Sequence, residues 1–373
     1  MTSAQPTRDA LASASSITLF SFGLGVSNLA FPLAALGAGY GAAQIGVLTA
    51  VSAVAQLLVR TTIPALGRRF ADRTMVSAAA ALLAASCAVV VISTAAVPFV
   101  IGELLQGAAR GYFWSGSQLH GIRTSASALK AIARVNLLSS AGLLLGPLTA
   151  GALAEKSSTT ALTLAAAGAA LGTGAGMLMT RLPVLGAPSA EEGGRTWRRP
   201  AVLRGSLAST GAGAWSALIV SYLPVLLASE QPPFVVGVLV AVANGANILA
   251  SVVVGVLRHD GLGGWLIAST VSNGLGLALV APAAGSVPLA AAALVLCGLG
   301  SGALLTLGPA LATMGVADDH RASAIAVTGG CRAAALLVTP LAVAGAVTAL
   351  PLGVAIAVIG VVLAVPLRIR RAA

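Results

Sequence analysis

Apolar runs about as long as a bilayer is thick recur along the whole chain. Two of the clearest, at 77–97 and 287–311, contain no charged side chain. Only 8% of all residues are Asp, Glu, Lys or Arg, against roughly 25% in soluble globular proteins. So few charges cannot cover the surface of a water-soluble protein of 373 residues, and disorder needs far lower hydrophobicity. We therefore expect an integral membrane protein.

The runs predict helices, not β-strands. Only helices and closed barrels span a bilayer, because every backbone polar group in lipid needs a partner within the protein. A barrel strand would alternate apolar and polar residues over roughly ten positions, whereas these runs are continuously apolar. The expected fold class is all-α with twelve transmembrane helices. The predicted spans are 13–36, 43–66, 75–95, 97–118, 132–153, 159–180, 205–228, 234–257, 263–283, 287–310, 322–347 and 350–367.

The Lys and Arg residues predict an orientation. If the N-terminus is cytoplasmic, the cytoplasmic segments hold 17 of the 21 Lys and Arg residues, and the opposite side holds only Lys156. The other three, Arg60, Arg110 and Arg332, fall within spans. Because cytoplasmic loops carry the excess of positive charge, we expect a multi-pass protein of the cell (inner or plasma) membrane with both termini in the cytoplasm.

The predicted spans form two halves of six, at 1–181 and 205–373, joined by a polar cytoplasmic linker at 182–204. The halves repeat each other at nearly constant offsets of 191, 192 and 193 residues. The matched pairs are Gly46–Val51 (GVLTAV) with Gly237–Val242 (GVLVAV), Pro32 with Pro224, and Pro147 with Pro340. Many transporters have such a parallel duplication and bind substrate between the repeats. We expect two parallel-repeated six-helix halves around a central cavity.

The fifth span carries the most specific local pattern. Gly142, Gly146 and Ala150 place small residues on one face, where a second helix can approach closely. Pro147 removes a backbone donor and favours a kink. With Gly151, the stretch resembles the GxxxGPxxGG motif of the drug:proton antiporters of the major facilitator superfamily, departing from it at Ala150. The resemblance implies that superfamily's fold and secondary transport.

A second motif of the superfamily, G-x-L-a-D-R-x-G-R-[RK] between spans 2 and 3, is present in weakened form. Leu66, Arg69 and Arg73 match it, but Arg68 stands where the motif has Asp, and the nearest acid is Asp72. The gating salt bridges of the motif therefore cannot be assigned residue by residue. The alternative interpretation is a positively charged cytoplasmic turn.

The fourth span has a polar stripe. Glu103, Gln106, Arg110 and Trp114 follow one another at spacings of three and four, which places them on one helix face. The superfamily often has R-x-x-Q-G here, and Glu103 replaces its Arg. A charge within the membrane is costly and often functional, so Glu103 is the proton-coupling candidate. The alternative is a structural carboxylate paired permanently with an arginine. The candidate charged cavity partners are Arg110, Arg332 and Arg60.

The superfamily resemblance also implies a cavity lined mainly by spans 1, 4, 7 and 10 and their neighbours. Besides Gln106 and Trp114, the cavity-lining candidates are Phe20, Asn28, Asn136, Trp215, Tyr222, Asn244, Asn247 and Ser301. Each of these side chains has a packing or interhelical hydrogen-bonding role as its alternative. The three histidines fall in segments predicted to be cytoplasmic loops and do not form a metal site.

Our leading hypothesis is a secondary active transporter that exports a small, partly apolar molecule by alternating access, coupled to protons. An importer of a sugar or metabolite is the first alternative, and a non-transporting receptor or membrane-embedded enzyme is the alternative of another class. No catalytic constellation is present, so we expect no enzymatic activity, cofactor or metal. The net charge of +11 is spread along the chain, so we expect no nucleic-acid partner. We expect a monomer in the lipid bilayer.

Overall fold

The computed structural model describes residues 4–67, 69–124, 128–183, 196–255, 262–314, 316 and 321–365. This part of the chain is helical and contains no strand, which confirms the all-α prediction. The helices are α1 Ala4–Gly37, α2 Ala42–Gly67, α3 Asp72–Ile92, α4 Ala96–Thr124, α5 Ala128–Ala154, α6 Ser158–Met177, α7 Pro200–Val220, α8 Tyr222–Ala228, α9 Pro233–Gly255, α10 Leu262–Ala283, α11 Val287–Met314, α12 Arg321–Ala346 and α13 Leu352–Ala364, with a 3-10 turn η1 at Thr196–Arg198.

Every predicted span coincides with a helix or, once, with a helix pair. In the described part of the chain, nine helices are long and apolar enough to cross a membrane, and the bent pair α7 and α8 would be a tenth. The helix α13 is shorter, at 13 residues. The helix α4 has 29 residues, so its polar side chains, not its length, keep it out of this group. The number of twelve spans stays a prediction.

The seventh predicted span is broken. The helices α7 and α8 are bent by 43° at Ser221, whose φ and ψ are −125° and −80°. Pro224 explains the position of the break, because a proline ring clashes with the carbonyl four residues earlier. That carbonyl belongs to Val220, where α7 ends. Its repeat partner Pro32 lies inside the continuous helix α1.

The chain forms two compact units. Unit 1 consists of 1–40 and 51–189, and unit 2 consists of 41–50 and 190–373. The change from one unit to the other at 189–190 lies within the predicted linker. The first turns of α2 are grouped with unit 2, whereas the sequence analysis assigned the whole of α2 to the N-terminal half.

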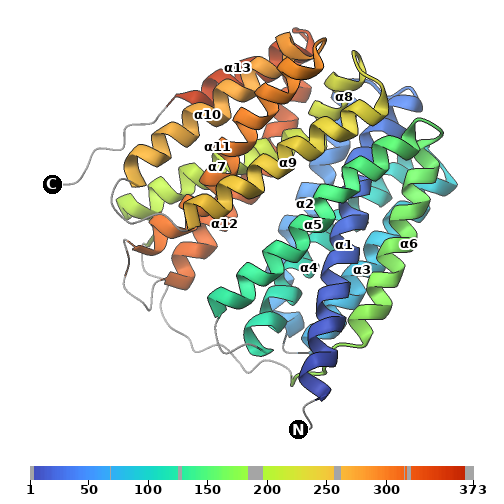
Figure 1. Ribbon diagram of the computed structural model, residues 1–373, viewed down its shortest axis with the longest axis vertical. Helices are drawn as coiled ribbons and strands as arrows, with labels where there is room; N and C mark the ends of the chain where they lie inside the picture. The colour runs from blue at the N-terminus through green and yellow to red at the C-terminus, as the bar shows by residue number, and fades with distance from the viewer. Residues whose placement is uncertain are drawn as a thin grey trace. The chain divides into compact units, whose positions relative to one another are not determined.

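Three helix pairs of unit 1 have counterparts in unit 2. In unit 1, α1 packs on α5, and α3 packs on both α4 and α6, an arrangement that can be followed in Figure 1. In unit 2, α7 packs on α12, and α10 packs on both α11 and α13. These pairs correspond one to one when the spans of the two halves are matched in chain order. The packing confirms the parallel repeat.

Glycines allow the closest helix contacts. A Cβ atom on Gly146 of α5 would lie 2.6 Å from the Cα atom of Gly25 in α1, and one on Gly142 would lie 2.5 Å from the backbone nitrogen of Phe22. The backbones of α1 and α5 therefore touch along the small-residue face predicted in the fifth span, as close helix association in lipid requires. Outside these contacts, large apolar side chains such as Ile92 remain exposed, as expected of surfaces that face lipid.

Candidate functional site

Two residues of the polar stripe of α4, Glu103 and Gln106, are buried. Glu103 is 6% exposed and Gln106 is 2% exposed. A Cβ atom on Gly107, next to Gln106, would collide with the backbone carbonyl of Ser52 in α2. This glycine therefore lets α4 approach α2 closely, and the approach excludes water from Glu103 and Gln106.

Arg110 is held by neutral partners from two helices. Its Nη2 group donates to Oδ1 of Asn28 in α1 and to Oε1 of Gln106 at 2.7 Å. Nε2 of Gln106 donates in turn to Oγ of Ser27 at 2.9 Å. The structure thus brings together three of the predicted site residues, Asn28, Gln106 and Arg110. Ser27 is a fourth member that the sequence analysis did not select.

Glu103 has a different environment. In the part of the chain that the structure describes, no basic side-chain nitrogen lies within 4.0 Å of its carboxylate oxygens. It interacts electrostatically with Arg110, two helical turns away on α4, and Ser52 of α2 lies beside it. The side chain of Arg60, another candidate partner, lies outside the described part. Among the described side chains, the carboxyl group can therefore gain or lose a proton without breaking a direct ion pair.

Aromatic packing surrounds the polar stripe. Phe20 of α1 stacks on Phe113 of α4 with ring centroids 3.6 Å apart and planes 4° apart. Trp114 meets Phe113 edge to face at 6.1 Å. Phe20 is fully buried, whereas Trp114 is half-buried. The predicted polar site of α4 therefore adjoins a cluster of packed aromatic side chains.

The remaining candidates are divided between unit 2 and undescribed side chains. Trp215, Tyr222 and Ser301 are buried, and Asn244, Asn247 and Arg332 are half-buried. The Tyr222 hydroxyl donates to the Pro340 carbonyl at 3.2 Å. The side chains of Asn136 and Leu66, and Arg68 as a whole, lie outside the described residues.

Unit 2 also contains a buried polar residue that the sequence analysis passed over. Asn273 of α10 is 1% exposed, and its Nδ2 group donates to the Gly211 carbonyl of α7 at 3.3 Å. A single asparagine in an apolar span is too common to indicate a site, so no local signal distinguishes it. It is a neutral contact between α7 and α10.

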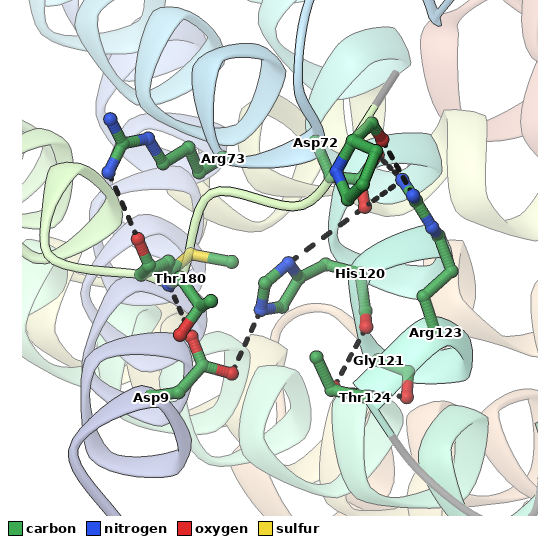
Figure 2. A network of polar contacts seen from close by, with 10 residues as sticks. Asp9, Asp72, Arg73, His120, Gly121, Arg123, Thr124 and Thr180 are labelled. Carbon is green, nitrogen blue, oxygen red and sulfur yellow. Dashed lines mark hydrogen bonds and ion pairs between the residues drawn. The ribbon is translucent and has the colours of Figure 1, made fainter. Parts of the chain in front are cut away.

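A charged cluster joins four segments at one end of unit 1, as Figure 2 shows. Nη1 of Arg123 donates to both oxygens of Asp72 at 2.9 Å, and its Nη2 donates to the carbonyl of Pro183 at 2.6 Å. His120 lies between Asp9 and Asp72. Oδ2 of Asp9 faces His120, and Oδ1 of Asp9 accepts from the backbone N–H of Thr180. The cluster thus links α1, α3, α4 and the segment after α6.

This cluster corrects one sequence-based expectation. His120 does not lie in a loop: α4 continues to Thr124, beyond the predicted end of the span at 118, and His120 is fully buried within it. In addition, Asp72 forms a salt bridge with α4, while Arg69 is exposed and Arg73 donates to the carbonyl of Met179 at 3.3 Å. The polar end of the helix was misassigned because its partners are distant in sequence.

The hydrogen bonds of Gln106 predict a stability effect. Gln106→Leu keeps approximately the same volume but leaves the N–H group of Arg110 and the hydroxyl of Ser27 without this partner. Ser27 keeps its bond to the Leu24 carbonyl and Arg110 its bond to Asn28, so the cost is that of the lost hydrogen bonds, about 1–3 kcal/mol. We expect a lower unfolding temperature of the purified protein in detergent. The control is Gln44→Leu, which removes a hydrogen bond at an exposed site and should change stability little.

The sequence model of the Major Facilitator Superfamily matches residues 14–340. The chain belongs to the Major Facilitator Superfamily. The superfamily resemblance seen in the fifth span is thereby confirmed. The protein is a multi-pass membrane protein and a secondary transporter of a small molecule, not an enzyme. A comparison with the curated proteins gave no match.

Solved structures of several transporters share this fold. The nucleoside transporter NupG is 14% identical, with a TM-score of 0.75 over 96% of this chain and 97% of that chain. A POT family transporter in complex with 5-aminolevulinic acid is 12% identical, with a TM-score of 0.73 over 95% and 93%. A bacterial homologue of the human lysosomal transporter Spinster is 15% identical, with a TM-score of 0.72 over 92% and 82%. At such identities the likeness concerns the fold alone.

Proposed function

We propose that this transporter exports a small, partly apolar molecule by alternating access and takes up protons in exchange, with Glu103 as the coupling carboxyl group. The observation that carries the proposal is the buried position of Glu103 without a direct ion pair in the described part of the chain. A carboxylate in such a place is expensive to keep charged. Protonation of Glu103 removes this cost, and it therefore stabilises the conformation in which the side chain is buried.

The neighbours of Glu103 support the same role. Arg110 remains hydrogen-bonded to Asn28 and Gln106, so its position does not depend on a bond to Glu103. The electrostatic interaction between Glu103 and Arg110 is present only when the carboxyl group is charged. Protonation of Glu103 thus removes its long-range attraction to Arg110 and leaves the hydrogen bonds of Arg110 with Asn28 and Gln106 in place.

A sequence motif supports export, and the packing of aromatic side chains supports the proposed substrate class. The stretch from Gly142 to Gly151 is similar to the motif of drug:proton antiporters, and its glycines place α5 in backbone contact with α1. The half-buried ring of Trp114, at one end of the polar stripe and packed edge to face on Phe113, suits a molecule with an apolar part. In the proposed topology, both termini lie in the cytoplasm and the protein acts as a monomer in the cell membrane.

The direct test is transport in everted membrane vesicles, with and without an imposed proton gradient, over a panel of small amphipathic compounds. We expect uptake of at least one compound when the vesicle interior is acidic, and loss of that uptake when an ionophore dissipates the gradient. Uptake that is indifferent to the gradient would refute proton coupling. Uptake favoured by the opposite gradient would refute export.

A further inference from the structure

Three buried polar atoms of unit 2 have no hydrogen-bond partner among the described residues. They are the indole nitrogen Nε1 of Trp215 in α7, the amide oxygen Oδ1 of Asn273 in α10 and the hydroxyl Oγ of Ser301 in α11. The three residues are 4%, 1% and 1% exposed. Polar atoms cut off from bulk water are costly without a partner, and nearly all of them in folded proteins bond to protein or to ordered water.

The helix contacts bring these three residues to one level of unit 2. Nδ2 of Asn273 donates to the Gly211 carbonyl of α7 at 3.3 Å, and Trp215 follows Gly211 one helical turn later. On α11, a Cβ atom on Gly300 would collide with the backbone nitrogen of Asn273, and Ser301 is the next residue. The three side chains therefore start within about one helical turn, 5.4 Å, of the same contact.

The indole of Trp215 faces the same part of α11. It interacts with the thiol of Cys297, which precedes Ser301 by one helical turn. Sulfur is a weak acceptor, and Nε1 of Trp215 forms no hydrogen bond with it. The thiol itself donates to the Leu294 carbonyl at 3.3 Å. The indole N–H group thus lies beside α11 and lacks an oxygen acceptor among the described residues.

Ser301 also leaves a common helical hydrogen bond unmade. A serine in a helix can donate to the carbonyl four residues earlier, as Ser216 and Ser221 of α7 do at 2.8 and 2.7 Å. The hydroxyl of Ser301 makes no such bond. It is therefore available to a partner outside its own helix.

The three atoms together match the bonding capacity of one water molecule. The indole N–H only donates, the amide oxygen only accepts, and the hydroxyl does either. The amide of Asn273 is oriented by Gly211, because a carbonyl can only accept, so Nδ2 faces it and Oδ1 points elsewhere. One water can accept from Trp215, donate to Asn273 and bond to Ser301. About three such bonds are typical of a buried water.

We propose that α7, α10 and α11 enclose a binding site for one water molecule, held by Trp215, Asn273 and Ser301. Gly211 leaves room beside the amide, because a Cβ atom there would meet only the end of the Leu304 side chain at 3.1 Å and Nδ2 of Asn273 at 3.8 Å. Trp215 and Ser301, which the sequence analysis selected as cavity-lining candidates, therefore bind water within unit 2 and not the transported molecule.

The site can be tested by X-ray hydroxyl-radical labelling of the purified protein, read out by mass spectrometry. The pulse converts bound water into radicals that label the side chains touching it, even where bulk solvent is excluded. After correction for intrinsic reactivity, we expect Trp215 to be labelled several times faster than Phe20, a fully buried ring stacked on Phe113. A corrected rate for Trp215 no higher than that of Phe20 would overturn the proposal.

Removing one ligand of the water provides a second measurement. Ser301→Ala takes away one of the three hydrogen bonds, so labelling of Trp215 should slow several-fold. Ser216→Ala is the matched control, because it makes the same change next to Trp215 but removes a hydroxyl that donates within α7. A rate that Ser301→Ala leaves unchanged, or that Ser216→Ala lowers equally, would refute the site. Because no transport is measured, the result is independent of whether Glu103 couples protons.

Discussion

Replacing Glu103 by glutamine is expected to abolish transport driven by a proton gradient while exchange of substrate across the membrane continues. Glutamine has nearly the same size as glutamate but neither its charge nor its titrating proton. If proton uptake by Glu103 drives the transport cycle, a proton gradient cannot drive transport by the variant. Exchange needs no net proton movement, so it should remain close to the wild-type rate.

The two modes can be compared in proteoliposomes that contain equal amounts of folded protein. One assay imposes a proton gradient, and the other preloads substrate and follows its exchange for labelled substrate at equal pH on both sides. Glu230→Gln is the matched control, because Glu230 is exposed in the turn between α8 and α9. Gradient-driven transport that survives in Glu103→Gln would contradict the proposed role. Equal loss of both modes would favour a structural carboxylate.

Most of the architecture could be predicted because it depends on local properties. Span positions follow from runs of apolar residues, and the parallel repeat follows from residues that recur at one offset. The end of helix α4 could not be predicted from such local properties. Its last residues, including His120 and Arg123, are polar and were predicted to lie outside the membrane span. They are helical and partly or fully buried, because Asp9 and Asp72 from other helices provide their partners.

The candidate site could be predicted only in part, for the same reason. The spacing of Glu103, Gln106 and Arg110 predicts that they share one helix face, and Gln106 and Arg110 are hydrogen-bonded there. The contact of Arg110 with Asn28 joins residues 82 positions apart, and nothing in the sequence pairs them. Likewise, proline alone does not predict a break, since Pro32 lies in an unbroken helix. The outcome at each proline depends on the helices packed around it.

The second large effect is expected at the contact between α1 and α5. A methyl group added at Gly146 would lie 2.6 Å from backbone atoms of Gly25 and Val26, which is too close for any carbon contact. Backbone atoms cannot rotate away as a side chain can, so the two helices must separate. Overpacking of this kind costs about 1–3 kcal/mol. Gly146→Ala should therefore lower the unfolding temperature in detergent and reduce transport per folded molecule.

Gly174 of α6 provides the control, because no atom lies within 4 Å of a Cβ placed there. Alanine raises helix propensity by about 1 kcal/mol relative to glycine at either position, so that favourable effect is common to the two variants. The difference between Gly146→Ala and Gly174→Ala then isolates the cost of separating α1 from α5. Equal stability of the two variants would show that the pair tolerates an added methyl group. Lower stability with normal transport would show that the contact is needed for folding but not for the transport cycle.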